Sequence, residues 1–222
     1  MAKIITVDEA AEQIKDGMSI MVGGFMGCGN PHAVIDALVR RNARNLTLIC
    51  NDGAWPGFGV GKLITNGQIK KLIATHVGLN KEVGQKMNSG ELEVQLIPQG
   101  TFAERIRCGG NGMGGFLTPT GFGTIIAEGK QVINTNGRDY LLELPLRADA
   151  ALIIGYKVDR SGNVWYRGTT RTFNVVMATA ADLVIVEADH IVELGEIEPE
   201  NVVTQGIFID YIADPSRGWR TI

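Results

Sequence analysis

Short apolar runs alternate with helical patterns along the first half of the chain, and this alternation constrains the fold more than any other feature. The apolar runs cover residues 18–22, 46–50, 69–74 and 92–97, and helical patterns follow at Pro31 and over residues 59–66, 79–88 and 101–107. Parallel strands need crossover connections, and helices then cover both faces of the sheet. The pattern therefore predicts an α/β fold with a mostly parallel sheet flanked by helices.

Two of the predicted helices carry recognisable N-terminal signals. Thr6 and Glu9 have the spacing of a capping box, and apolar residues at helical spacing follow, so a short amphipathic helix is expected to open the chain. Asn30 precedes Pro31, which predicts a helix capped by Asn30 with the proline at its first position.

From about residue 109 the pattern changes. Glycines become frequent, and turn sequences at 134–137 and 159–163 predict hairpins, so a smaller β-rich portion is expected over roughly residues 109–170. Residues 172–181 then read as a helix and 183–186 as a buried strand. We interpret residues 1–222 as one domain with an elaborated second half and a poorly structured tail over 214–222.

Composition excludes several classes of function. Lys and Arg total 21 against 24 for Asp and Glu, so the net charge of -3 offers no basic surface for nucleic acid or for an acidic membrane. Three widely spaced cysteines predict neither a disulfide framework nor a zinc site, and the separated histidines give no metal-binding pattern. We therefore expect a cytoplasmic protein with no metal site, no nucleic-acid partner and no membrane span.

Ligands of open parallel sheets bind beyond the carboxyl ends of the strands. The residues that follow the four predicted strands are therefore the place to look for a site. A glycine-rich loop over residues 23–29 follows the first strand, Asn51 and Asp52 follow the second, Thr75 and His76 the third, and Gln99 the fourth. Two primary amides, a glycine loop and one imidazole are thus expected to converge.

The glycine loop is the strongest of these features. A strand, a flexible turn and a helix start would aim several backbone N–H groups at one point, where a phosphate or a transient oxyanion could bind. A plain tight turn fits the spacing equally well. Two other glycine patterns are weaker: residues 110–115 lack the strand and helix that a dinucleotide site needs, and residues 57–62 lack the Ser or Thr that a P-loop needs.

A nucleophile with a base partner is harder to find. Cys28 lies beside a predicted helix start, where a thiol can ionise readily, but a small loop-filling residue explains it as well. Asp52, Asp182 and Glu187 are candidate acids or bases, yet isolated acids at strand ends more often hold loops and helices. Within this chain alone we assemble no persuasive nucleophile and base.

The segment from Asp16 to Pro31 carries a family resemblance. It reads Asp-Gly, two free positions, three apolar residues, Gly-Gly-Phe, three free positions, Gly, one free position and Pro. This resembles the signature of family I coenzyme A transferases without a departure. Further stretches that look like the α (A) subunit of the 3-oxoacid transferases are residues 48–52, 98–101, 104–110, 116–121 and 145–149.

The resemblance implies a two-subunit enzyme that moves coenzyme A (CoA) between an acyl-CoA, such as acetyl-, butyryl- or succinyl-CoA, and a 3-oxoacid such as acetoacetate. The acetate or butyrate:acetoacetate transferases are the nearest type, and succinate- and oxoadipate-using relatives share the same motifs. The family's covalent intermediates form on a glutamate of the partner β subunit, in complexes of α2β2 or α4β4 type. CoA is then a substrate, and no tightly bound cofactor is implied. The missing nucleophile has a reason, since this chain would supply half of an active site.

The resemblance also implies roles for particular residues. Gln99 would donate to the oxyanion, and Asn51 would contact the acyl or thioester region, as neutral amides suited to developing charge. The CoA site would be lined by Gly24, Phe25, Met26, Gly27, Cys28, Gly29 and Asn30. A sugar-phosphate isomerase or a phosphate-sensing module on a similar sheet remains the alternative from the residues alone.

Overall fold

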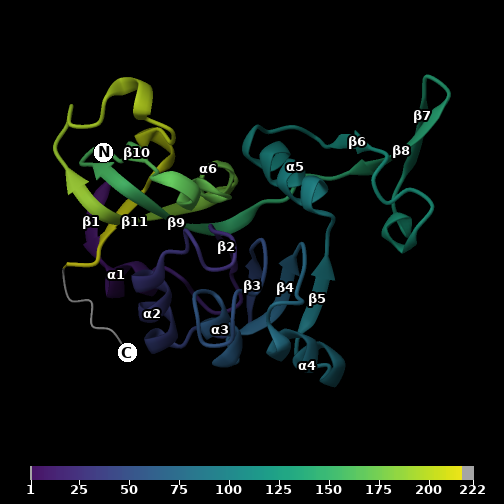
Figure 1. Cartoon of the computed structure of the whole chain (residues 1–222), viewed down its shortest axis with the longest axis horizontal. Coiled ribbons are helices and arrows are strands. Elements are labelled where there is room, and N and C mark those ends of the chain that lie inside the picture. The colour runs from purple at the N-terminus through teal and green to yellow at the C-terminus, as the bar shows by residue number, and fades with distance from the viewer. Residues whose placement is uncertain (1, 217–222) are drawn as a thin grey trace.

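The computed structural model describes residues 2–216, and its centre is a nine-stranded, mostly parallel sheet (Figure 1). A short strand, β10 (Val164–Trp165), pairs antiparallel with β9 outside the main path. From one edge to the other, the parallel strands are β1 (Lys3–Thr6), β12 (Tyr211–Asp214), β11 (Ala181–Val192), β9 (Ala148–Asp159), β2 (Ser19–Val22), β3 (Leu46–Ile49), β4 (Ile69–Ala74) and β5 (Glu93–Leu96).

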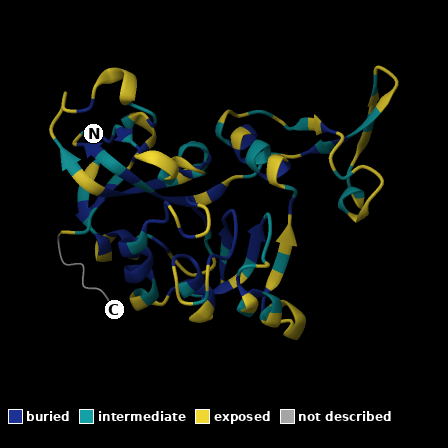
Figure 2. Cartoon of the chain, in the orientation of Figure 1, coloured by how far each residue is buried: buried dark blue, intermediate teal, exposed yellow. Residues whose placement is uncertain are grey.

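Helices cover both faces of this sheet. One apolar core lies beneath α1 (Val7–Glu12), α2 (His32–Arg41), α3 (Gly61–Thr65) and α4 (Lys81–Ser89). The second core lies on the opposite face beneath α5 (Gln99–Gly110) and α6 (Asn174–Met177). Figure 2 shows the buried residues gathered in the central strands. The predicted α/β fold, with a mostly parallel sheet and flanking helices, is confirmed.

The four predicted strands of the first half are present at nearly the predicted bounds, and so are the helices that follow them. The capping box of α1 is also formed, because the Glu9 N–H donates to Thr6 Oγ1 and the Thr6 N–H donates to Glu9 Oε2. One expectation is wrong: a strand, β1, precedes this helix. β1 pairs in parallel with β12, with Lys3 opposite Tyr211, and a partner so distant in the sequence leaves no local signal.

The second half contributes a separate three-stranded antiparallel sheet, which confirms the predicted smaller β-rich portion. It is built from β6 (Phe116–Thr118), β8 (Arg138–Glu143) and β7 (Val132–Thr135), and it stands away from the main sheet as an arm (Figure 1). From β9 onward the chain is back in the main sheet. Single-turn 3-10 helices are Ile125–Ala127, Gly168–Arg171, Pro199–Asn201 and Gly206–Phe208.

Two expectations for the second half need correction. The helix predicted over 172–181 is only the single turn α6, because Ala181 already begins the long strand β11, which contains the predicted strand 183–186. The tail predicted from residue 214 begins too early, since Asp214 is the last residue of β12 and pairs with Thr6. Residues 217–222 of that tail lie outside the described residues.

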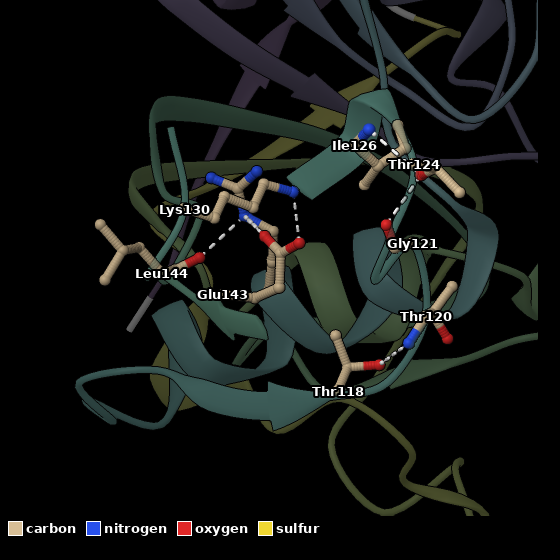
Figure 3. A network of polar contacts seen from close by, with 9 residues as sticks. Thr118, Thr120, Gly121, Thr124, Ile126, Lys130, Glu143 and Leu144 are labelled. Atoms are coloured by element: carbon tan, nitrogen blue, oxygen red, sulfur yellow. Dashed lines mark hydrogen bonds and ion pairs between the residues drawn. The ribbon is translucent and has the colours of Figure 1, made fainter. Parts of the chain in front are cut away.

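A buried carboxylate ties the arm to the body. Glu143 at the end of β8 is almost fully buried and accepts a hydrogen bond from Lys130 Nζ (Figure 3). Its Oε2 lies 3.9 Å from Arg105 Nε. Arg105 belongs to α5 and donates to the Leu144 carbonyl at 2.8 Å. The charge of Glu143 is therefore compensated by one cation of the arm and one of the body.

We expect Glu143→Ala to lower the free energy of unfolding by about 3 kcal/mol, because it leaves two partly buried cations without their carboxylate. Urea unfolding measures the loss, and faster amide hydrogen exchange in β7 and β8 should accompany it. Glu128→Ala removes an exposed acid of the same arm and is the matched control, with a change within about 0.5 kcal/mol. Equal effects of the two variants would contradict this account.

The helices of residues 2–216 are short, and none has the length and apolar character needed to cross a lipid bilayer.

Candidate active site

The expected convergence of polar groups occurs at the carboxyl ends of β2, β3, β4 and β5. These strands are neighbours in the sheet, all parallel, so the residues that follow them meet at one edge. The loop of residues 23–30 follows β2, Asn51 follows β3, Thr75 follows β4, and Gln99 begins α5 after β5.

Gln99 and Asn51 are in direct contact. Gln99 Nε2 donates to Asn51 Oδ1 at 2.7 Å, and Thr75 Oγ1 lies 2.9 Å from Gln99 Oε1 and 2.9 Å from the Asn51 carbonyl oxygen. Asn51 is fully buried, whereas Gln99 is exposed. The pair therefore presents a primary amide to solvent on a rigid buried support, and Gln99 Nε2 keeps a second hydrogen for another acceptor.

Asp52 joins this pair to the glycine loop. Its Oδ2 accepts from Asn51 Nδ2 at 2.8 Å and from the Met26 N–H at 2.9 Å, and its Oδ1 accepts from the Ala54 N–H at 2.8 Å. A carboxylate occupied by three donors holds a loop in place and is not free to act as a base. The interpretation of this acid as a loop-holding group is therefore confirmed.

The glycine loop folds back on itself as a small hairpin. Phe25 and Cys28 exchange two backbone hydrogen bonds of 2.9 Å, and Gly24 and Met26 have φ values of +116° and +52°. The side chains of Phe25, Met26 and Cys28 are exposed. Cys28 Sγ lies 3.4 Å from Thr169 Oγ1. The loop thus offers main chain and apolar side chains to a ligand at the same edge as Gln99.

Asn30 does not cap α2, and that prediction is wrong. The helix begins at His32 with Pro31 as its N-cap residue, which makes no side-chain cap bond. The buried Asn30 amide instead donates to the Gly23 carbonyl at 2.6 Å and accepts from the Val60 N–H at 3.1 Å. In this position the Asn30 side chain satisfies two buried backbone groups, closes the loop and fixes the start of α3. The helix does not need Asn30 as a cap, because another residue supplies one.

That other residue is Glu187 of β11. Its carboxylate accepts from the Val34 N–H at 2.8 Å and also from the Ala33 N–H, so the first N–H groups of α2 are already occupied. Burial raises the pKa of Glu187 to about 7, although the two N–H bonds oppose the rise. The glycine loop and the helix after it had suggested a phosphate site at this point. Because Glu187 occupies these N–H groups, the start of α2 is not open to a ligand phosphate.

Asn174 of α6 is a further residue of the site that sequence reasoning missed. Its Nδ2 donates to the Gly29 carbonyl at 2.9 Å and to the Thr170 carbonyl at 2.7 Å, and its Oδ1 accepts from the Ile154 N–H at 3.1 Å. The side chain is fully buried. It ties the glycine loop to the second half of the chain, and nothing in the local pattern around residue 174 signals that contact.

The two weaker glycine patterns have structural roles. Residues 110–115 run from the last residue of α5 into the loop before β6, which is not the strand-to-helix turn of a dinucleotide site. Lys62 lies in α3 and pairs with Asp36 of α2 rather than facing an open loop. Over residues 2–216, His, Cys, Asp and Glu side chains form no group of three that could hold a metal ion.

Comparison with known proteins assigns the family. The family model described as coenzyme A transferase matches residues 4–214. The chain is 54% identical over 211 residues to the acetoacetyl-CoA:acetate/butyrate CoA transferase alpha subunit of Clostridium acetobutylicum, with 95% of this chain and 97% of that protein covered. It is 51% identical over 210 residues to the acetate CoA-transferase subunit alpha of Escherichia coli K12, with 95% and 96% covered.

A solved structure agrees on the fold. The thioester complex of an acyl-CoA transferase from Escherichia coli O157:H7 superposes with a TM-score of 0.85 at 19% identity, over 98% of this chain and 48% of that one. The sugar-phosphate isomerase alternative is not favoured by these matches. The signature in residues 16–31 and the matches over nearly the whole chain lead to one assignment: the protein belongs to the coenzyme A transferase family, as an alpha (A) subunit.

Proposed function

We propose that this chain is half of an enzyme that moves CoA between a short-chain acyl-CoA and a 3-oxoacid such as acetoacetate. The names of the two relatives at over half identity support acetate, butyrate and acetoacetate as the acids, with succinate-using relatives at lower identity. The three free cysteines support a reducing compartment such as the cytoplasm.

The proposed chemistry is a ping-pong exchange on a glutamate of the partner β subunit. The glutamate carboxylate attacks the thioester carbonyl, and the CoA thiolate leaves, which gives an acyl-glutamyl anhydride. The thiolate then attacks the glutamyl carbonyl and releases the first acid, which leaves a glutamyl-CoA thioester. The acceptor carboxylate reverses these two steps with a new acyl group. Every step passes through a tetrahedral oxyanion.

Gln99 is the residue that we assign to this oxyanion. Its exposed amide can donate a hydrogen bond without a change of charge, and Asn51 and Thr75 hold it before charge develops. Asn51 in this proposal fixes Gln99 and borders the acyl group. The contact of Gln99 with Asn51, and of Asn51 through Asp52 with the glycine loop, is the observation that carries the proposal.

The glycine loop is proposed to line the CoA site. Its seven residues, from Gly24 to Asn30, lie at the same edge as Gln99, and Asp52 fixes Met26 to that edge. Gly24 and Gly29 cannot easily be replaced, since both have positive φ and a Cβ would lie within 2.6 Å of other atoms. The backbone of the loop can therefore approach a ligand closely.

A partner subunit is part of the proposal. The alpha-subunit names of the relatives imply a β subunit, and we propose an α2β2 or α4β4 complex. Sedimentation of the co-expressed pair measures this stoichiometry.

The isolated chain is expected to be inactive, and addition of the β subunit should restore acetoacetyl-CoA formation from acetoacetate and acetyl-CoA. Borohydride reduction of the enzyme incubated with acetoacetyl-CoA should trap the glutamyl thioester, and peptide mapping should place the reduced residue in the β subunit. Transfer activity of the isolated chain, or a modified residue between Met1 and Ile222, would contradict the proposal.

A further inference from the structure

The start of α2 lacks a cap from its own segment. The residue before the helix is Pro31, which makes no side-chain cap bond, and the first backbone bond into the helix is from the Ile35 N–H to the Pro31 carbonyl. The N–H groups before Ile35 need acceptors from elsewhere. Glu187 supplies one from the middle of the sheet, more than 150 residues further along the chain.

Several ionisable groups surround this contact. Glu187 lines a cavity of about 620 Å³ between the start of α2, the second halves of β9 and β11, and the end of β12. Burial lowers the pKa of His32 and raises that of Asp189, and the negative charges of Asp189 and Asp36 help to raise the pKa of Glu187. The charged or titratable groups that face Glu187 or its cavity are Asp189 and His190 of β11, His32 and Asp36 of α2, with Lys62 paired to Asp36, and Asp214 of β12.

The first turn of α2 is linked mechanically to the glycine loop. The loop ends at Asn30, so only Pro31 separates it from His32, the first residue of α2. The His32 ring packs on Phe58 with centroids 5.0 Å apart, and Phe58 lies so close to Gly27 that a Cβ there would be 2.3 Å from its ring. A shift of the first turn of α2 is thus passed to the loop by the backbone and by this aromatic contact.

We propose that Glu187 is a positioning residue of the glycine loop: by capping α2 from β11, its carboxylate holds the loop in the conformation that binds CoA. The proposal rests on the proposed function of that loop. The ionised carboxylate accepts the two N–H bonds more strongly than the neutral acid and interacts favourably with the helix dipole. The loop is therefore held best above about pH 7, where Glu187 is ionised, and is loosened below it.

The kinetic test uses the complex with the β subunit. In the wild type, KM for acetyl-CoA should rise about fivefold as pH falls from 8.5 to 6, which corresponds to about 1 kcal/mol of helix-terminus interaction. Glu187→Gln should show the high KM at every pH. Asp189→Asn removes a negative neighbour, lowers the pKa of Glu187 and should move the midpoint to lower pH. Asp182→Asn, on the same strand but paired with Arg147, is the matched control and should follow the wild type.

The second test does not depend on activity. In two-dimensional NMR spectra of the full chain, the amide signals of Gly27, Gly29 and Val34 should titrate together near pH 7, and Glu187→Gln should abolish this titration although the histidines are intact. Persistence of the titration in Glu187→Gln, or an unmoved midpoint in Asp189→Asn, would overturn the positioning role. If these amide signals titrate as expected but the complex does not transfer CoA, the proposed function alone is refuted.

Discussion

In the complex with the β subunit, Gln99→Ala should lower kcat for CoA transfer about 100-fold, which corresponds to a loss of about 2.7 kcal/mol of transition-state stabilisation. The variant removes a neutral donor whose position is fixed by Asn51 and Thr75 before the reaction begins. Because the donor is needed most when the oxyanion forms, KM for acetyl-CoA should change much less than kcat. Steady-state kinetics of the purified complex measures both constants.

Two further variants sharpen this prediction. Gln95→Ala removes an exposed amide from within β5, before the carboxyl end where the site lies, and should leave kcat unchanged. Gln99→Glu keeps the shape of the side chain but places a negative charge beside the developing oxyanion, so it should lose at least as much activity as Gln99→Ala. A loss of activity in Gln99→Ala that is entirely due to dissociation of the complex would refute the donor role.

The meeting of Gln99 with Asn51 is the part of the site that sequence reasoning predicted best. It follows from a rule about topology, since the carboxyl ends of neighbouring parallel strands share one edge, and the strands themselves have strong local signals. The rule does not need the side-chain contacts to be known. It places Thr75 and the glycine loop at the same edge for the same reason.

The residues that hold the site in place could not be predicted in this way. Asn30 has the spacing of a helix cap, but its partners outside the helix, Gly23 in the same loop and Val60 further along the chain, decide its role. Glu187 and Asn174 come from segments that reach the loop only in the folded chain. Local pattern identifies the elements, whereas the contacts of Glu187 and Asn174 depend on how the second half of the sheet packs on the first.

A similar limit applies to the sheet edge and the arm. Nothing in the sequence around Lys3 indicates that it pairs with Tyr211. The turn at residues 134–137 correctly predicts the β7–β8 hairpin, yet the charge of Glu143 that fixes the arm to α5 is compensated by Arg105, which lies in another element. Turn chemistry is local and predictable, while compensation of a buried charge is not.

Asn174→Ala should lower the free energy of unfolding by about 4 kcal/mol, the largest stability effect that we expect. Three buried or partly buried backbone groups, at Gly29, Thr170 and Ile154, lose their hydrogen-bond partner, and each such loss costs about 1–3 kcal/mol. Chemical denaturation of the chain measures this change. Asn201→Ala, at an exposed position in the second half, is the matched control and should stay within about 0.5 kcal/mol of the wild type.

A double-mutant cycle with Gly23 tests whether the Asn174 side chain is what requires a glycine at position 23. A Cβ at Gly23 would lie 1.9 Å from Asn174 Oδ1. Gly23→Ala should therefore be strongly destabilising in the wild type, because it displaces the Asn174 side chain from its hydrogen-bond partners. In the Asn174→Ala background that atom is absent, and Gly23→Ala should cost at least about 1 kcal/mol less. Additive effects would mean that Gly23 is constrained by the backbone alone. A smaller cost of Gly23→Ala in the Asn174→Ala background would instead show why the signature requires this glycine: Asn174, from the far half of the chain, occupies the space beside it.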